Sequence, residues 1–197
     1  MLPVYISGRQ LRLSELFSLA PFAITSDWYG APLPQPVLIY LAVDPAAIHF
    51  GAQVMSAPSC DMALAPGSFV EGLWEEDVIE LFIKDDGSAR YQEFNLAPSG
   101  AWWTAVFSEY RIRVHTEDFA TPAAIFSKHD GSRWKVGFSC LREALAVQAC
   151  FTEQSKAAVY AITGKHERRY CALVPGSGKP DFHLSSSFLN LLPVACA

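Results

Sequence analysis

Short apolar segments separated by turn residues run through this 197-residue chain and restrict it to a fold of many short strands. The clearest run is residues 77–107, where three strand-length segments, 77–83, 90–96 and 102–107, are joined by Asp85-Asp86-Gly87 and by Pro98-Ser99-Gly100. Both linkers favour tight turns, because glycine readily adopts positive φ and proline presets a turn conformation. Three strands joined by two tight turns predict an antiparallel meander.

Similar segments occur on both sides of the meander. The chain has 13 Phe, 7 Tyr and 5 Trp, which favour strands, and 51% of its residues are hydrophobic, which is enough for a sizeable core. We therefore predict an all-β sandwich formed by one domain, residues 1–197. Further strands are expected at 36–43, 47–54, 132–139, 157–162 and 168–174, a short helix at 141–147, a long loop at 56–72, an opening strand or N-terminal arm at 1–35, and a C-terminal tail at 175–197 that packs over the sheet.

Charge and cysteine content exclude several classes of protein. The net charge is −5, and the densest basic group, around Arg168 and Arg169 with Lys165 and His166, is read as a solvated strand edge, so we expect no nucleic-acid partner. The five cysteines form no CxxC pair and are odd in number, which favours free thiols in a reducing compartment. Without a convincing signal peptide or a bilayer-length apolar run, we expect a cytoplasmic protein with no membrane partner.

Alternation along the meander gives each strand two different faces. Val78, Glu80 and Phe82 share one face of their strand, and Glu93 and Asn95 share the corresponding face of the next. A sandwich must bury only one face, so this mixed polar and aromatic face is free to line a concave surface. The adjacent Trp102 and Trp103 must point to opposite faces. One of them would form a stacking platform, or else a sheet edge covered by the C-terminal tail.

Three segments in this region resemble a known family. Residues 72–83, 91–100 and 107–111 look like the bacterial DOMON-like proteins, which are similar to family 9 carbohydrate-binding modules, and residues 178–183 resemble their closing motif. The match covers residues 72–111 well and 157–183 moderately, whereas the first 70 residues match only in strand pattern. The resemblance implies an antiparallel sandwich of immunoglobulin-like or jelly-roll type that binds sugar or, in some relatives, haem.

The same resemblance suggests individual residues. Trp74 and Glu80 match a Trp and a Glu that contact the sugar in family 9 modules. The second Trp of those modules has no counterpart after Trp134, and Phe182, His183 or Phe188 would have to replace it. The predicted ligand site comprises Trp74, Glu80, Glu93, Asn95, Trp102, Trp103, Arg111, Lys179, Asp181 and His183.

Three of these residues, and Arg90 nearby, also have a structural interpretation. Trp74 would then be a core anchor at a strand entrance. Arg90 and Arg111 would form ion pairs with Glu80 or Glu93 instead of binding vicinal hydroxyls. Likewise, His183 would pin the tail to a backbone carbonyl instead of binding a ligand or, with Asp181, a metal.

Four functions remain open, of which non-catalytic carbohydrate binding is preferred. A glycoside-active enzyme would use Glu80 and Glu93, but the chain has no GxSxG, HExxH or P-loop motif, and we predict no catalytic residues. The third function is haem binding, in which a methionine would pair with a histidine. A calcium cofactor would instead be held by oxygen-rich loops. The fourth is a protein-interaction surface. The haem candidates are Met55 or Met62 with His49, His115, His166 or His183, and the calcium candidates are 75–77 and 85–86. Nothing in the sequence selects an oligomeric state.

Overall fold

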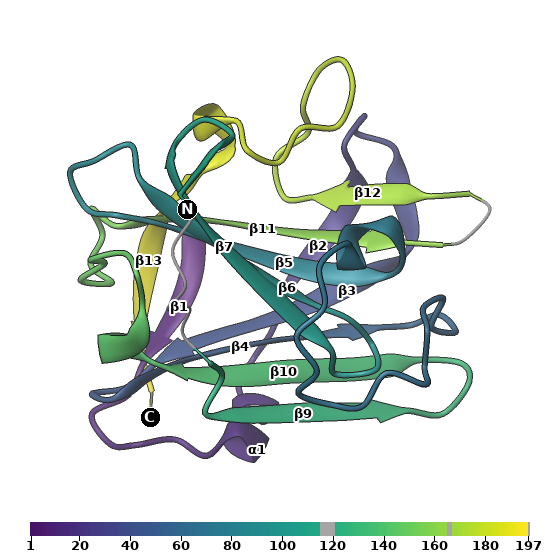
Figure 1. The fold of residues 1–197 in the computed structure, drawn as a ribbon, viewed down its shortest axis with the longest axis horizontal. Helices are drawn as coiled ribbons and strands as arrows, with labels where there is room; N and C mark the ends of the chain where they lie inside the picture. The colour runs from purple at the N-terminus through teal and green to yellow at the C-terminus, as the bar shows by residue number, and fades with distance from the viewer. Residues whose placement is uncertain (115–120, 165–166, 197) are drawn as a thin grey trace.

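In the computed structural model, which describes residues 1–114, 121–164 and 167–196, thirteen strands form a hydrogen-bonded sheet that folds into two layers (Figure 1). The strands are β1 (Leu2–Ile6), β2 (Phe22–Asp27), β3 (Pro32–Val43), β4 (Ala47–Val54), β5 (Val78–Lys84), β6 (Tyr91–Leu96), β7 (Trp102–Glu109), β8 (Ile112–Val114), β9 (Ala124–His129), β10 (Trp134–Leu141), β11 (Lys156–Thr163), β12 (Arg169–Ala172) and β13 (Leu189–Ala195). The helical segments are α1 (Leu13–Leu16) and three single 3-10 turns, η1 (Leu73–Glu75), η2 (Arg142–Ala144) and η3 (Ser185–Ser187).

The strand order separates the two layers. The first layer runs β8-β7-β6-β5-β11-β12, and the second runs β2-β3-β4-β10-β9. Neighbours along this path are antiparallel, whereas β1 pairs in parallel with both β13 and β3, so the sheet is mixed. β1 and β13 lie side by side at one end of the sandwich (Figure 1). No helix among the described residues is long and apolar enough to cross a membrane.

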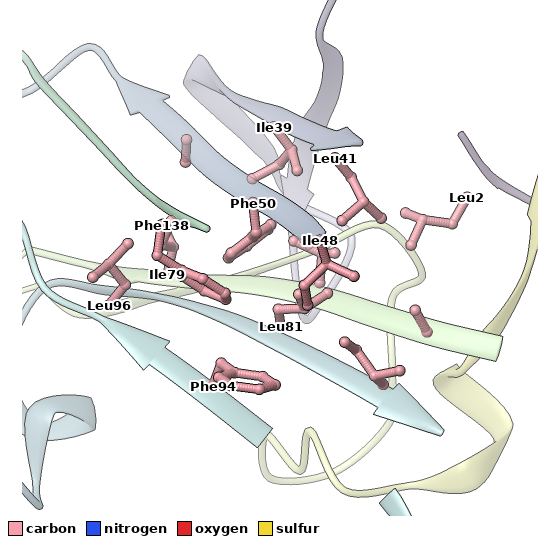
Figure 2. Close-up of a cluster of buried hydrophobic side chains, with 14 of the residues drawn as sticks. Leu2, Ile39, Leu41, Ile48, Phe50, Ile79, Leu81, Phe94, Leu96 and Phe138 are labelled. Carbon is pink, nitrogen blue, oxygen red and sulfur yellow. The ribbon is translucent and has the colours of Figure 1, made fainter. Parts of the chain in front are cut away.

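The main core fills the space between the layers. Ile79 and Leu81 of β5 and Phe94 of β6 meet Phe50 of β4 and Phe138 of β10, as Figure 2 shows. The rings of Phe94 and Phe138 lie 5.2 Å apart and tie the two layers together. The alternation that predicted one strongly apolar face for β5 and for β6 is therefore confirmed, although the buried Gln92 shares that face of β6 and donates to Thr104 on β7.

The outer face of the first layer carries a second apolar cluster. Val78, Phe82 and Tyr160 belong to it, and the C-terminal tail covers them with Phe182 and Phe188. The sheet between the two clusters is therefore buried on both faces, which exceeds the one buried face that a sandwich needs. The predicted ligand face is consequently a covered surface, and its remaining opening is described below.

Both ends of the chain are more structured than predicted. Residues 1–35 contribute β1, α1 and β2, and the tail ends in β13, which pairs with β1 and β11. The predicted helix at 141–147 is the single turn η2. All five cysteines are free thiols, of which Cys140 and Cys171 are buried and Cys150 is exposed.

The loop 56–72 packs along β7 instead of projecting into solvent. Val70 donates a backbone hydrogen bond to Trp102, which in turn donates to Ser68, and Gly67 donates to Gly100. Gly100 has a φ of +88°, and a Cβ there would lie 3.0 Å from the Cβ of Pro66. Both the turn and the close approach of the loop therefore require glycine at position 100.

Two glycine substitutions separate these requirements. Gly87 also has positive φ, +78°, but a Cβ there has no neighbour within 4 Å. We expect Gly87→Ala to cost about 1 kcal/mol for the backbone conformation alone. Gly100→Ala should cost about 2–3 kcal/mol, because it adds a clash in a packed interface. Urea unfolding measures both, and equal losses would show that the loop does not press on the turn in solution.

Candidate functional site

The outer face of the first layer contains a cavity of about 460 Å³, a volume typical of small-molecule sites. β5, β6 and β7 form its floor, and η1, the start of β8 and the C-terminal tail form its walls. Its polar lining consists of Glu71, Glu80, Glu93, Arg111, Arg113 and His183. Its aromatic lining consists of Trp74, Trp103, Phe107, Tyr170 and Phe182.

Strand register brings the polar floor together. Glu80 on β5 is opposite Asn95 on β6, and Asn95 is opposite Trp103 on β7. Glu93 lies two residues before Asn95 and therefore on the same face. A single row across three strands thus places a carboxyl, an amide and an indole on one face of the sheet, as the sequence alternation predicted. Glu80 and Trp103 line the cavity, and Asn95 lies beside it.

The two carboxyl groups of the floor are buried, with Glu80 3% and Glu93 5% exposed. Burial, followed by the neighbouring charge of Glu93, raises the pKa of Glu80 well above its ordinary value. Burial also raises the pKa of Glu93 to about 7, although a hydrogen bond from Asn95 and the charges of Arg111 and Arg113 oppose the rise. The floor therefore holds exchangeable protons near neutral pH.

His183 reaches the cavity from the tail and approaches Glu93. Its Nδ1 lies 2.8 Å from the hydroxyl of Tyr91, and its Nε2 lies 3.8 Å from Oε2 of Glu93. Burial, reinforced by the nearby charge of Arg111, lowers the pKa of His183 to about 4, so the ring is neutral at pH 7. His183 therefore ties the tail to the hydroxyl of Tyr91 and not to a backbone carbonyl, the partner expected from the sequence.

Acidic partners neutralise the two arginines that line the cavity. Arg111 Nη2 binds Oδ1 of Asp181 at 2.8 Å, and Arg113 Nη1 binds Oε1 of Glu71 at 2.7 Å. Tyr110 also donates to Asp181, at 2.6 Å. Arg111 thus pairs with the tail and not with Glu80 or Glu93, the ion-pair partners considered from the sequence.

Two tryptophans form one wall of the cavity. The rings of Trp74 and Trp103 meet edge to face at 5.0 Å, and the guanidinium of Arg113 lies 5.1 Å from the Trp103 ring. Trp103 is only 3% exposed, whereas Trp74 is half-buried. Trp74 therefore offers the more accessible aromatic surface.

Arg168, predicted to be part of a solvated strand edge, positions this wall. Its guanidinium donates hydrogen bonds to the backbone carbonyls of Trp74 and Glu75 in η1. It is half-buried, and its contacts cross more than ninety residues of sequence. The sequence also did not predict three further cavity residues, because nothing local in it marks them as such. These residues are Glu71, Arg113 and Tyr170.

The structure gathers most of the predicted site residues and separates two of them, Trp102 and Lys179. The cavity is lined by Trp74, Glu80, Glu93, Trp103, Arg111 and His183. Asn95 lies beside Glu93 and donates to it at 3.0 Å, and Asp181 fixes Arg111 from behind. Trp102 faces the main core, where its Nε1 donates to Gly67, and Lys179 is exposed outside the cavity lining. Of the three replacements considered for the second Trp, Phe182 and His183 line the cavity and Phe188 does not.

Several buried polar atoms around the cavity lack a partner among the described residues. They include Oδ1 of Asn95, Nε1 of Trp103 and Nε of Arg113. Within the same residues, the Glu80 carboxyl makes no hydrogen bond or ion pair. Buried polar groups are rarely left unpaired, and the three atoms named here and the Glu80 carboxyl lie on or beside a cavity wall. A polar ligand would satisfy both donors and acceptors.

The haem and calcium candidates have other partners. Both ring nitrogens of His49 are engaged, and Met55 accepts a hydrogen bond from Gln53. His115 and His166 lie outside the described residues. Among the residues described, no group of three or more His, Cys, Asp or Glu side chains is arranged to hold a metal ion. The carboxylates of Asp77, Asp85 and Asp86 instead accept backbone N–H groups of neighbouring loops.

A second polar cluster lies in the interior near β4. Oδ2 of Asp44 is 2.9 Å from Nε2 of His49, whose Nδ1 is 2.7 Å from Oγ of Ser139. The residue types are those of a hydrolase triad. However, all three side chains are buried, and the cavity at this end is lined by Asp44 but by neither His49 nor Ser139. The cluster is therefore a structural network.

No family model matches the chain, and no curated protein matches its sequence. Solved structures do match. A candidate carbohydrate-binding protein from Bacteroides uniformis superimposes with a TM-score of 0.69 at 14% identity, over 98% of this chain and 99% of that one. A family 9 carbohydrate-binding module from Caldicellulosiruptor kristjanssonii, in complex with cellotriose, gives 0.63 at 11% identity, over 99% and 95%. The chain has the fold of a family 9 carbohydrate-binding module. The glucose complex of a family 9 module from the same organism gives 0.58 at 10% identity, over 99% and 97%.

The family 9 fold confirms the predicted sandwich and the resemblance noted in the sequence. It extends over the first 70 residues, where the sequence matched only in strand pattern. The fold thereby includes the N-terminal strands β1 to β4 and the second layer, which the quoted motifs did not reach.

Proposed function

We propose that this protein binds carbohydrate, without catalysis, in the cavity on the outer face of its first layer. The observation that carries the proposal is the combination of an indole wall with unpartnered buried polar atoms in one cavity. Sugar rings present apolar faces that pack on indoles and hydroxyls that both donate and accept hydrogen bonds. The likeness to a family 9 module in complex with cellotriose supports the same class of ligand.

Each part of the cavity has a role in this proposal. Trp74 packs against one face of the sugar ring, and Trp103 and Phe182 limit its position from the sides. Glu80 and Asn95 accept hydrogen bonds from hydroxyls, while Trp103 donates through Nε1. Arg111 and Arg113, held by Asp181 and Glu71, are fixed at the rim before the ligand arrives. Such preorganisation reduces the entropy lost on binding.

The carboxyl pair gives the enzyme alternative one supporting observation, because an acid with a pKa of about 7 suits proton donation. A glycosidase also needs a second carboxylate that stays ionised to act as nucleophile or base. Burial raises the pKa of both groups in this cavity, which disfavours a permanently ionised partner. We therefore expect no turnover of chromogenic glycosides by the wild-type protein.

A binding screen with a matched pair of variants tests the proposal. Mono- and disaccharides should raise the melting temperature and shift tryptophan emission of the wild-type protein. Trp74→Ala should weaken the affinity about tenfold or more, because it removes the accessible stacking surface. Tyr29→Ala removes an aromatic side chain that is 65% exposed and lies outside the cavity, so it should leave affinity unchanged. Absence of a response to every saccharide, or equal losses in both variants, contradicts the proposal.

A further inference from the structure

The floor of the cavity contains more carboxyl groups than available cations. Glu80 and Glu93 both face the cavity from neighbouring strands, and each is at least 95% buried. Ionising both places two like charges in a poorly solvated site. A countercharge from the protein would normally be expected beside them.

The nearby cationic side chains are paired with groups other than the two carboxyls. Arg111 is paired with Asp181 and Arg113 with Glu71, both at salt-bridge distance. Arg168 donates to backbone carbonyls of η1 and makes no ion pair with Glu80 within the described chain. His183 approaches Glu93 only to 3.8 Å and is held neutral. The charges of Arg168 and Arg111 lower the pKa of Glu80 from a distance, but neither side chain contacts its carboxyl group.

Within residues 1–114, 121–164 and 167–196, the other titratable side chains around the pair are phenols and add no positive charge. Tyr91 on β6 and Tyr160 on β11 face the floor, and burial raises the pKa of both, that of Tyr91 to about 12. Tyr170 on β12 contributes a third phenol to the lining. Among the residues that the structure describes, no cationic side chain therefore forms an ion pair with Glu80, and Glu93 has only the neutral His183 at 3.8 Å.

The unpartnered atoms match a cationic donor. Glu80 accepts no hydrogen bond among the described residues, and the buried Oδ1 of Asn95, opposite it in register, also lacks a donor. An ammonium group supplies three donors together with a full positive charge. The adjacent indoles of Trp74 and Trp103 are themselves favourable neighbours for a cation.

We propose that the cavity selects sugars that carry a free amine, and that it places the ammonium group against Glu80, Glu93 and Asn95 while the ring packs on Trp74. This inference rests on the proposed carbohydrate-binding function and specifies its ligand class. Trp103 Nε1 is a donor, so it takes a ring hydroxyl oxygen and not the ammonium group. An acetylated amine would not fit the scheme, because it has lost its charge and two donors.

Three sugars with the same ring test the inference by calorimetry at pH 7. Glucosamine should bind at least tenfold more tightly than glucose or N-acetylglucosamine. Glu80→Gln should reduce that ratio toward one, whereas Glu143→Gln, a carboxyl removed outside the cavity, should preserve it. Titration in two buffers of different ionisation enthalpy should show proton release with glucosamine, because the ammonium displaces protons from the carboxyl pair. Glucose should release none.

The outcomes separate the two proposals. If glucose binds as tightly as glucosamine, or if the ratio survives Glu80→Gln, the amine inference fails while carbohydrate binding stands. Equal binding of glucosamine and N-acetylglucosamine overturns the inference in the same way. If none of these sugars, and no other saccharide in the screen, binds at millimolar concentration, both proposals fail.

Discussion

Replacing Asp44 with alanine is expected to destabilise the protein by about 3–5 kcal/mol, although Asp44 lies far from the ligand cavity in the fold. Its carboxylate is 3% exposed and accepts four hydrogen bonds. The donors are the backbone N–H groups of Leu11, Ala46 and Ala47 and Nε2 of His49, at 2.7–2.9 Å. Alanine would leave all four donors buried without an acceptor.

The physical basis is that one side chain ties three segments together. Asp44 closes the turn between β3 and β4, attaches the segment before α1 through Leu11, and orients His49 toward Ser139 on β10. Burial alone would raise the pKa of Asp44, but the hydrogen bonds outweigh burial and lower it. Its stabilising effect is therefore present above the pKa of the unfolded chain and is lost as pH falls through the folded value.

Guanidinium unfolding at neutral pH measures the loss. Asp44→Asn retains one oxygen acceptor and should be intermediate between wild type and Asp44→Ala. Asp130→Ala is the matched control, because Asp130 pairs with Arg133 on an exposed hairpin and its removal should leave the midpoint nearly unchanged. Similar midpoints for Asp44→Ala and Asp130→Ala would contradict the proposed network.

The central meander could be predicted from sequence because its signals are local. Strands β5, β6 and β7 begin and end within two residues of the predicted segments. Period-two alternation also placed Trp102 and Trp103 on opposite faces, as the structure shows. These predictions need only the pleat of a strand and the turn preference of glycine.

The strands that the sequence did not reveal have weak local signals. β9 lies at the edge of the sheet and is half polar, and β13 contains Pro193, which argues against a strand. Both are strands because a partner is available, β10 for β9 and β1 for β13. Pairing between segments far apart in sequence is a tertiary effect that local pattern does not encode.

The candidate site likewise has one part that local sequence predicts and another that depends on tertiary packing. Alternation predicted which side chains share the face of Glu80, but the shape of the cavity depends on η1 and the tail. η1 is held by Arg168, and the tail by the pairing of Asp181 with Arg111. Sequence spacing allowed Arg111 to pair with Glu80, Glu93 or a ligand, and only the packed tail decides among them.

Glu93→Gln is expected to stabilise the protein at pH 8 by about 3 kcal/mol relative to wild type, and by little at pH 5. Burial raises the pKa of Glu93 from an ordinary 4.5 to about 7. The native state then binds more protons than the unfolded state between these values, so the free energy of unfolding falls as pH rises through this window. Each pKa unit corresponds to about 1.4 kcal/mol. Glutamine keeps the shape of the protonated acid and does not titrate.

The comparison must be made as a difference between two proteins, because His183 has an opposing effect. Its pKa is lowered to about 4, so the unfolded state binds more protons than the native state between pH 4 and about 6.5, and stability from this group rises with pH there. Burial and the charges of Arg111 and Asp181 set the pKa of His183, and Glu93→Gln leaves these unchanged, so the effect of His183 largely cancels in the difference. Burial also raises the pKa values of the Cys140 and Cys171 thiols in the folded protein. Thiols of the unfolded chain would ionise first above pH 8 and add their own pH dependence, so pH 8 is the upper limit of the comparison.

Urea unfolding of wild type, Glu93→Gln and the control Glu143→Gln at pH 5, 6, 7 and 8 provides the measurement. The difference for Glu93→Gln should grow with pH, and that for Glu143→Gln should stay flat. Glu80→Gln should behave like Glu93→Gln, because burial and the charge of Glu93 raise the pKa of Glu80 as well. A constant difference across this range would mean that the carboxyl pair is solvated or already neutralised by a cation in solution. The acidic floor that favours an amine ligand would then be absent, since the amine is attracted only by charge that the protein leaves uncompensated.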